Sequence, residues 1–343
     1  MDVTQFDFDL PRERIAQRPA RPRDAARMLV VTPERLVDAE VMDLPSQLHP
    51  GDLLVFNDTK VIPARLTGTR SAARGTAKIE VTLNRPVSAG FWSAFARPAK
   101  RLQSGDTIDF GALRGRVEGR GEGGEVVLAF DSDQELFAAL ERVGTMPLPP
   151  YMSRDADVDD RTDYQTMFAR TPGAVAAPTA ALHFTPRLMA ALAERGVRHA
   201  FVTLHVGAGT FLPVTAEDTG AHRMHPEWGE AGEELVQAVA DTRRSGGRVV
   251  AVGTTSLRVL ESAARDDGTI DAFRAETRLF ITPGFRFRVA DRLLTNFHLP
   301  RSTLFMLVCA FAGTERMQAA YAHARNAEYR FYSYGDCCLL SRA

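Results

Sequence analysis

Polar and small side chains gather in three short segments of this chain whose residue types suit the binding of an anion. The segments contain His205, Gly207, Gly209 and Thr210; Thr254, Thr255, Ser256 and Arg258; and Asn296, His298 and Ser302. Backbone N–H groups at helix starts, together with glycines that permit close approach, favour a carboxylate or a phosphate. Hydroxyl residues also cap ordinary helices, so capping alone remains an alternative for the threonine-rich segment.

Three histidines, His183, His205 and His298, lie at the expected boundaries of secondary-structure elements. Imidazole titrates near neutral pH, so it can act as a general base or as a hydrogen-bond donor. A single histidine at such a boundary is more often a satisfied structural group. Because three of them lie near one expected site, we predict that one takes part in the chemistry.

The segment HRMHPEW holds His222, His225 and Glu227, which are all possible ligands of a divalent ion. Pro226 disfavours helical backbone at His225, which removes the helical spacing that a metal site would use. There is no Cys pair nearby and no local third histidine. Hydrogen bonding to a substrate or to the backbone is therefore the preferred interpretation, and we predict no metal.

The commonest nucleotide and hydrolase motifs are missing from the sequence. The stretch HVGAGTF has Leu212 where a dinucleotide fingerprint requires its third glycine. Neither a G-x-S-x-G elbow nor a phosphate-binding GK[ST] loop occurs. The three polar segments thus do not form a Rossmann dinucleotide site, an α/β-hydrolase site or a P-loop.

The elements around these segments alternate between helix and strand. Predicted helices cover residues 186–195 and 232–244 and two further segments, one opened by the polar stretch GTTS and one beginning near 304. Predicted strands cover 198–206, 248–252 and 291–297. Alternation of this kind predicts an α/β fold with a mostly parallel sheet flanked by helices. The ligand site should lie beyond the carboxyl ends of the strands, where all three polar segments begin.

A different pattern occupies residues 67–145. Short alternating runs such as AKIEVTL, GFWSAFA and EVVLAF are broken every 8 to 12 residues by Gly, Pro, Asn or Asp. Such spacing is typical of a small antiparallel barrel or sandwich. We therefore predict an inserted small antiparallel β-barrel domain at 67–145, and a discontinuous α/β catalytic domain formed by residues 1–66 and 146–343.

Length and composition bound the class of protein. The 343 residues are 45% hydrophobic and 25% charged, which is ordinary for a globular protein of two domains. No apolar run approaches the ~20 residues that cross a bilayer, and no secretory signal is present, so we expect a cytoplasmic protein that does not enter the membrane. The three cysteines show no CxxC spacing and are expected to be reduced thiols.

The formal net charge of −1 argues against a uniformly basic surface but allows a local basic groove. Six arginines lie within sixteen residues near the N-terminus: Arg12, Arg14, Arg18, Arg21, Arg23 and Arg27. Arginine suits bidentate phosphate recognition, so these residues can line an RNA groove, although a solvated face would look similar. Near the C-terminus, AEYRFYSYGD offers aromatic rings beside Arg330, which suit base stacking or ordinary packing.

Eight stretches together resemble one protein family: FDFDLPRERIAQRPARPRDAARMLV, GDLLVFNDTKVIPARL, ALHFTP, VTLHVGAGTFLPV, HRMHPEW, VGTTSLRVLES, LLTNFHLPRSTLFMLV and YRFYSYGD. In these motifs the chain is similar to the S-adenosylmethionine:tRNA ribosyltransferase-isomerases of queuosine biosynthesis. The match runs from the N-terminus almost to the C-terminus. It is weakest through the predicted β insertion.

The resemblance implies a transferase that consumes S-adenosylmethionine and modifies tRNA. The ribosyl part of S-adenosylmethionine would be transferred to, and isomerised on, 7-aminomethyl-7-deazaguanine at the wobble position of the anticodon arm. The products would be epoxyqueuosine-tRNA, adenine and methionine. An enzyme of this kind must bind an amino-acid carboxylate, an adenine and a splayed anticodon base, and it needs no metal or other cofactor.

Residue roles follow from residue type and position within the matching motifs. The candidate catalytic residues are His298 and His205, with Asp58 as a rival base. The candidate substrate-binding residues are Gly207, Gly209, Thr210, Thr254, Thr255, Ser256, Arg258, Asn296, Ser302 and His183. The candidate tRNA-binding residues are Arg18, Arg21, Arg23, Arg27, Arg65 and Arg330, and Arg258 is a further candidate for a tRNA phosphate.

Some positions depart from the pattern of the family. Ala181 replaces a glycine before LHFT, Thr282 stands where an aromatic residue precedes Pro-Gly, and Cys337 and Cys338 follow YGD. If the glycine permits close approach of a ligand, the methyl group of Ala181 would crowd the site. Two alternatives therefore stay open, a noncatalytic tRNA-binding module and a metal-dependent hydrolase built on the HRMHPEW segment. We expect the protein to be a monomer.

Overall fold

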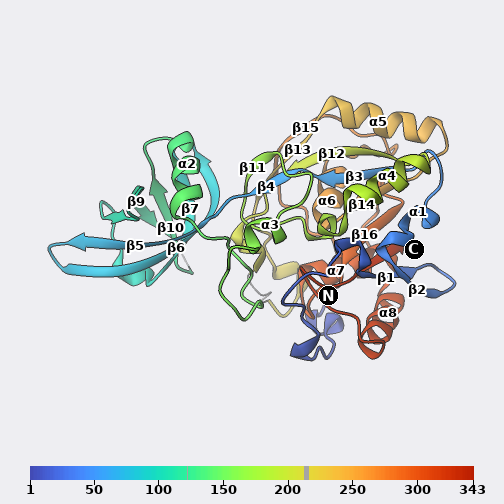
Figure 1. The fold of residues 1–343 in the computed structure, drawn as a ribbon, viewed down its shortest axis with the longest axis horizontal. Helices are drawn as coiled ribbons and strands as arrows, with labels where there is room; N and C mark the ends of the chain where they lie inside the picture. Colours follow the sequence, from blue (N-terminus) through green and yellow to red (C-terminus); the bar gives the residue numbers. More distant parts are fainter. Residues whose placement is uncertain (122, 212–215) are drawn as a thin grey trace.

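Two bodies of different architecture make up the structure, a computed structural model that describes residues 1–121, 123–211 and 216–343. An α/β body holds both termini, and a small β-barrel projects from one side of it (Figure 1). The chain enters the barrel after β4 (Thr59–Val61) and returns to the body after α2 (Asp133–Val143).

A mixed sheet of nine strands forms the centre of the α/β body. In spatial order the strands are β15 (Phe273–Thr277), β13 (Glu227–Ala231), β12 (Arg198–Leu204), β3 (Leu53–Asn57), β14 (Val249–Val252), β16 (Arg292–Asn296), β17 (Cys337–Ser341), β1 (Arg27–Val31) and β2 (Leu36–Glu40). The four central strands, β12, β3, β14 and β16, run parallel to one another. Antiparallel pairs add β13 and β15 on one side and β17 on the other.

Both faces of the sheet are buried, because side chains alternate along each strand. In β3, Leu53 and Val55 join the cluster that packs under α5, α6, α7 and α8, whereas Leu54 and Phe56 join the cluster under α1 and α4. These helices are α1 (Leu44–Gln47), α4 (Pro186–Glu194), α5 (Glu233–Arg244), α6 (Thr254–Ser262), α7 (Thr303–Ala312) and α8 (Thr314–Asn326). The apolar, β-branched composition of the central strands fits this double burial.

Short elements complete the α/β body. They are α3 (Asp160–Asp163), a parallel pair formed by β4 and β11 (Thr171–Ala174), and the 3-10 turns η1 (Val3–Phe6), η2 (Arg12–Arg14), η3 (Arg23–Ala25), η4 (Val41–Asp43), η6 (Thr179–His183), η7 (Ala208–Phe211) and η8 (Thr219–Ala221). Within the described ranges, no helix has the length and apolar character needed to cross a membrane.

The projecting body is a closed antiparallel barrel. Its strands, in order around the barrel, are β10 (Glu125–Ala129), β7 (Phe91–Arg97), β6 (Gly75–Ser88), β5 (Arg65–Ala72), β8 (Thr107–Asp109) and β9 (Arg114–Arg120), with η5 (Ala99–Arg101) beside them. Helix α2 begins at the cap Ser132, whose side chain accepts a hydrogen bond from the N–H of Glu135. Trp92 is buried in the barrel core and donates its indole N–H to Asp133 over 3.0 Å.

The architecture agrees with the predicted fold class, an α/β body with an inserted β-barrel. The predicted helices and strands on either side of the three polar segments correspond to α4, β12, α5, β14, α6, β16 and α7. The pattern did not identify the strand β5 or the helix α2, both of which belong to the barrel body. The predicted parallel arrangement is found in the four central strands, whereas β16 and β17 pair antiparallel.

Candidate active site

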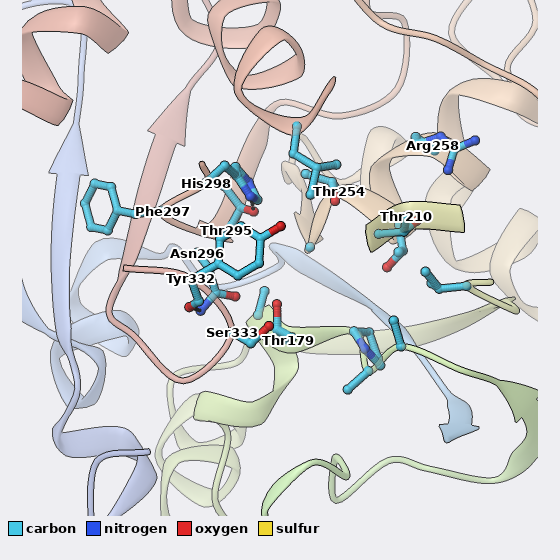
Figure 2. A pocket seen from close by; sticks show the side chains of 18 of the residues that line it. Thr179, Thr210, Thr254, Arg258, Thr295, Asn296, Phe297, His298, Tyr332 and Ser333 are labelled. Atoms are coloured by element: carbon cyan, nitrogen blue, oxygen red, sulfur yellow. Dashed lines mark hydrogen bonds between the residues drawn. The ribbon is translucent and has the colours of Figure 1, made fainter. Parts of the chain in front are cut away.

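A cavity opens at the carboxyl ends of the central parallel strands, where the three polar segments converge as predicted. It encloses about 710 Å³ of empty space, counting open solvent at its mouth. Its lining includes residues that follow β12, β14 and β16, and the segments 176–180 and 332–333 complete it. Figure 2 shows side chains from these separate segments around one common space, with Phe297 directed away from it.

The first wall of the cavity is the N-terminus of α6. Gly253 adopts a φ of +90°, a conformation that side chains rarely accept, and it turns the chain from β14 directly into the helix. Thr254 and Thr255 then present the first turn of the helix to the cavity. Within the described part of the chain, the buried hydroxyl oxygen of Thr255 has no hydrogen-bond partner. The helix start therefore offers a free hydroxyl and a partial positive charge to a ligand.

A buried ion pair forms the second wall. Arg258, one turn further along α6, is 6% exposed, and Glu227, the first residue of β13, is also 6% exposed. The guanidinium of Arg258 donates one hydrogen bond to Glu227 through Nη1 and another to the carbonyl of Leu279 through Nε, over 3.1 Å. The remaining nitrogen, Nη2, is buried without a partner among the described residues.

Asn296, the last residue of β16, contributes a buried amide. Its Nδ2 donates to the carbonyl of Tyr332 over 3.2 Å and lies 3.3 Å from Nε2 of His183. Burial lowers the pKa of His183 to about 4, and the charges of Arg23 and Arg330 act in the same direction. The neutral imidazole can therefore accept a hydrogen bond from the Asn296 amide. Among the described residues Oδ1 of Asn296 has no partner, so it can accept a hydrogen bond from a ligand.

His298 lines the cavity directly after β16. Its Nε2 lies 3.0 Å from the hydroxyl of Thr295, and its backbone N–H donates to the hydroxyl of Tyr321 over 2.9 Å. The side chain is 5% exposed, and burial lowers its pKa to about 3. His298 is therefore neutral at physiological pH and can accept a proton, which it holds only weakly.

The other two predicted catalytic residues do not line this cavity. His205 stacks on Trp228 with ring centroids 5.3 Å apart, and its Nδ1 lies 2.8 Å from the hydroxyl of Thr59. Burial lowers its pKa to about 4, against the opposing charge of Asp58. The carboxylate of Asp58 accepts from Thr203 over 2.7 Å and pairs with Arg170 over 3.0 Å. Both side chains thus have partners that account for their positions without a substrate.

Four predicted substrate-binding residues are also engaged elsewhere. A Cβ on Gly207 would lie 2.6 Å from the side-chain oxygen of Asn84, and one on Gly209 would lie 2.9 Å from the ring of His225. The absence of a side chain at these glycines therefore makes room for neighbouring side chains of the protein. The Ser256 hydroxyl donates to the carbonyl of Val252 at the end of β14, and Ser302 is the N-cap of α7. Of the predicted set, the structure brings together in the cavity Thr210, Thr254, Thr255, Arg258, Asn296 and His298.

The predicted tRNA-binding arginines all have acidic partners within the chain. Arg18 pairs with Asp157, Arg21 and Arg23 with Asp163, Arg27 with Asp38, Arg65 with Glu80 and Asp155, and Arg330 with Asp336. The carboxylates paired with Arg18, Arg27 and Arg65 are exposed, so phosphates can replace them at small cost. The carboxylates of Asp163 and Asp336 are buried. Arg258 is different, because its burial in the cavity keeps it from the surface where a tRNA backbone would lie.

The HRMHPEW segment borders a second cavity beside the first, but its potential metal ligands do not converge. Glu227 is occupied by Arg258, and the ring of His222 packs against Phe280 with centroids 5.1 Å apart. Within the described ranges, no three His, Cys, Asp or Glu side chains are grouped as a metal site would require. The observed contacts of Glu227 favour a hydrogen-bonding role for this residue.

Several cavity residues were not identified from the sequence as site residues. They are Tyr151, Tyr164, Thr179, Tyr332 and Ser333, and the hydroxyl of Tyr151 is hydrogen-bonded to that of Ser333. YRFYSYGD contains the last two, and its aromatic content was the signal available.

The cavity contact from the ALHFTP region comes from Ala180, whereas Ala181 is fully buried in the core beside α4, so its methyl group does not crowd this cavity.

Comparison with known proteins agrees with the resemblance. The family described as queuosine biosynthesis protein matches residues 3–340. The S-adenosylmethionine:tRNA ribosyltransferase-isomerase of Sphingopyxis alaskensis is 62% identical, over 99% of this chain and 97% of that protein. The protein of the same name from Parvibaculum lavamentivorans is 61% identical over 99% of both chains.

A solved structure adds a relative of known fold. The crystal structure of S-adenosylmethionine tRNA ribosyltransferase from Thermotoga maritima is 36% identical to this chain, with a TM-score of 0.56. The match covers 98% of this chain and 99% of that one. Taken with the full-length relatives and the matching family, it shows that the chain belongs to the queuosine biosynthesis protein family, among the S-adenosylmethionine:tRNA ribosyltransferase-isomerases.

Proposed function

We propose that this enzyme transfers the ribosyl moiety of S-adenosylmethionine to 7-aminomethyl-7-deazaguanine at the wobble position of tRNA and isomerises it there. The products are epoxyqueuosine-tRNA, adenine and methionine. The coarser activity, that of a transferase in queuosine biosynthesis, follows from family membership.

The observation that carries the proposal is the set of unsatisfied polar atoms in one cavity. Thr255 Oγ1, Arg258 Nη2 and Asn296 Oδ1 are buried in or beside it without partners among the described residues. Buried polar groups in native proteins are almost always hydrogen-bonded, so three orphans in one cavity indicate a missing ligand. That ligand must offer both acceptors and donors, as S-adenosylmethionine does.

The chemistry begins at the sulfonium of S-adenosylmethionine, whose positive charge acidifies the adjacent 5′ carbon of the ribose. A general base removes a proton from that carbon, and adenine departs. Loss of the 5′ proton breaks the bond between C4′ and the ring oxygen, and that oxygen expels adenine and leaves an aldehyde at C1′. The amine of the modified base then adds to C4′, the resulting carbanion at C5′ closes on C1′, and the new oxyanion at C1′ displaces methionine from C5′ to form the epoxide.

His298 is the base that we assign to the first step. His298 lines the cavity, and burial lowers its pKa to about 3, so the imidazole is neutral and has a ring nitrogen that can take up a proton beside the ligand. A proton taken from the 5′ carbon can therefore be passed on to the departing adenine.

Asn296 is the residue that we assign to the adenine. Its amide is oriented by Tyr332 and His183, so the free Oδ1 can accept only from a donor on the ligand. The exocyclic amino group of adenine is such a donor. In Figure 2, Asn296 and Arg258 lie on different sides of the cavity, which leaves the ribose and the sulfonium between them.

The experiment that tests the function is incubation of the purified protein with S-adenosylmethionine and tRNA carrying 7-aminomethyl-7-deazaguanine. Stoichiometric release of adenine and methionine, with formation of epoxyqueuosine in the tRNA, is the expected result. The matched control is the same tRNA carrying guanine at the wobble position, which lacks the nucleophilic amine and should yield no modified nucleoside. Binding of both tRNAs without release of adenine would instead identify a noncatalytic tRNA-binding module.

A further inference from the structure

We propose that the buried pair of Arg258 and Glu227 is a clamp for the amino-acid end of S-adenosylmethionine. Arg258 Nη2 would bind the carboxylate of the methionine moiety, and Glu227 would bind its ammonium group. This inference rests on the proposed function, because it assigns one part of the same co-substrate to one part of the same cavity.

The guanidinium is held in a single orientation by two of its three nitrogens. Nε donates to the carbonyl of Leu279 over 3.1 Å, and Nη1 donates to Glu227. Because the guanidinium is planar and rigid, these contacts fix the direction of Nη2, which has no partner among the described residues. A buried cationic donor left open in this way is costly unless a ligand satisfies it.

The surroundings of Nη2 favour a carboxylate. Thr254 and Thr255, one turn before Arg258 on α6, bring the N-terminus of the helix to the same cavity. The partial positive charge of this helix start adds to that of the guanidinium. The free hydroxyl of Thr255 supplies one more donor for an anionic oxygen.

Glu227 explains why the anion should carry an ammonium group beside it. Both Glu227 and Arg258 line the cavity, and the one contact of the second Glu227 oxygen among the described residues is a long one, 3.4 Å from the Thr210 hydroxyl. A phosphate at Nη2 would be repelled by this carboxylate. A zwitterionic α-amino acid instead places its negative group on the guanidinium and its positive group on the carboxylate. The complementary charges thus select the methionine end of S-adenosylmethionine over a nucleic-acid phosphate.

The test is a matrix of four ligands against three proteins, measured by calorimetry without tRNA. The ligands are S-adenosyl-L-methionine, its decarboxylated counterpart, its deaminated counterpart, and 5′-methylthioadenosine, which lacks the whole amino-acid end. The proteins are the wild type, Arg258→Lys and Glu227→Gln. Lysine keeps a charge for Glu227 but lacks the fixed third donor, and glutamine keeps the shape of Glu227 but loses its charge.

We expect the wild type to bind S-adenosyl-L-methionine about 10-fold to 100-fold more tightly than the decarboxylated or the deaminated counterpart. A loss of this size is what removal of one hydrogen bond to a charged group causes, since each tenfold change in affinity corresponds to ~1.4 kcal/mol. Arg258→Lys should lose the discrimination against the decarboxylated ligand and keep that against the deaminated one. Glu227→Gln should do the reverse. Both variants should bind 5′-methylthioadenosine as the wild type does, which controls for folding.

Wild-type protein that binds all four ligands equally would overturn the clamp without any variant. Variants that weaken all four ligands by the same factor would make the pair a structural ion pair and also overturn it. Failure of the proposed function looks different: S-adenosyl-L-methionine would be bound with full discrimination, yet no adenine would be released with the modified tRNA.

Discussion

At the scale of single residues, the cavity combines unsatisfied polar atoms with histidines that burial keeps neutral. Asn296, Thr255 and Arg258 each leave one buried atom without a partner in the described part of the chain. Such atoms cost stability in the free protein and return it when a ligand binds. The same low-polarity surroundings prevent His298 and His183 from holding a charge. The site therefore lowers the stability of the free protein and in return provides groups for ligand recognition and proton transfer.

His298→Gln should reduce turnover by ~100-fold or more while the affinity for S-adenosylmethionine stays within a few-fold of wild type, because the ring would act on the proton and not on the ligand as a whole. Single-turnover release of adenine with modified tRNA measures the effect. His205→Gln is the matched control, since His205 is a partly buried histidine whose pKa is also lowered but lies outside the cavity lining. Equal losses in both variants would argue against His298 as the base.

Stability should fall on mild acidification, because His183, His205 and His298 have pKa values of about 4, 4 and 3 in the folded state. Unfolded histidines titrate near 6.5, so between pH 6.5 and about 4 the unfolded state binds protons that the folded state does not, and the free energy of unfolding decreases as pH falls. Urea unfolding at pH 7 and pH 5 measures the decrease. His298→Gln should reduce it by about 2 kcal/mol, and an identical decrease would contradict the assignment.

At the scale of elements, helix starts position most of the site. Helix α6 begins immediately after β14 because Gly253 makes the turn, and α7 begins at Ser302, whose hydroxyl accepts from the N–H of Phe305 over 3.1 Å. The two starts face the cavity from neighbouring parallel strands, β14 and β16. Strand-to-helix turns of this kind fix the direction of side chains more rigidly than free loops.

Ser302→Ala should lower the free energy of unfolding by about 1 kcal/mol, because it removes the N-cap of α7. Denaturant unfolding measures this loss. Ser302→Asp should retain most of the stability, since aspartate also caps and complements the helix dipole. Because Ser302 does not line the cavity, turnover at a temperature where both variants are folded should be close to that of wild type. A large loss of turnover in Ser302→Asp would return Ser302 to the substrate-binding set.

At the scale of the whole molecule, two adjacent chain crossings join the barrel to the α/β body. Arg65 and Thr145 pair through reciprocal backbone hydrogen bonds of 3.2 and 2.9 Å, so the outgoing and returning segments run side by side. Gly144 packs against the outgoing segment, where a Cβ would lie 2.1 Å from the carbonyl oxygen of Pro63. The two crossings are therefore held together by a tight backbone contact.

Gly144→Ala should destabilise the protein by about 1–3 kcal/mol, because the added methyl group cannot fit beside Pro63 unless one of the crossings moves. Differential scanning calorimetry measures the effect as a lower melting temperature. Gly119→Ala, on β9 of the barrel, is the control, since a Cβ there meets nothing within 4 Å. Equal melting temperatures for the two variants would show that the crossing tolerates the methyl group.

Replacement of Arg18, Arg21 and Arg23 by glutamine should weaken tRNA binding and flatten its salt dependence, because each phosphate contact releases counterions. Fluorescence titration over a range of salt concentrations measures both effects. The control replaces Arg243 and Arg244 on α5, which also pair with aspartates. If the salt dependence of tRNA binding is unchanged in the variant that lacks Arg18, Arg21 and Arg23, these arginines serve only the ion pairs with Asp157 and Asp163.

The sequence by itself determined the elements and the edge of the sheet at which the site lies. Helix caps, glycines and apolar runs are local signals, so α4, β12, α6 and β16 could be predicted from neighbouring residues alone. Parallel strands bring their carboxyl ends to one edge, which predicted the convergence of three polar segments. The family motifs added the chemistry that such a site would serve.

Only the tertiary structure decided which polar residues face the cavity. His205 and Asp58 have the right types and lie at the right edge, but Thr59, Trp228 and Arg170 engage them. The sequence offered Glu227 as a possible metal ligand, whereas in the structure it accepts a hydrogen bond from Arg258, 31 residues away in the chain. Partners so distant in sequence leave no local pattern, and the burial that lowers the pKa of His298 comes from several elements at once. Residue types can be read from the chain, whereas pairing and desolvation exist only once the chain has folded.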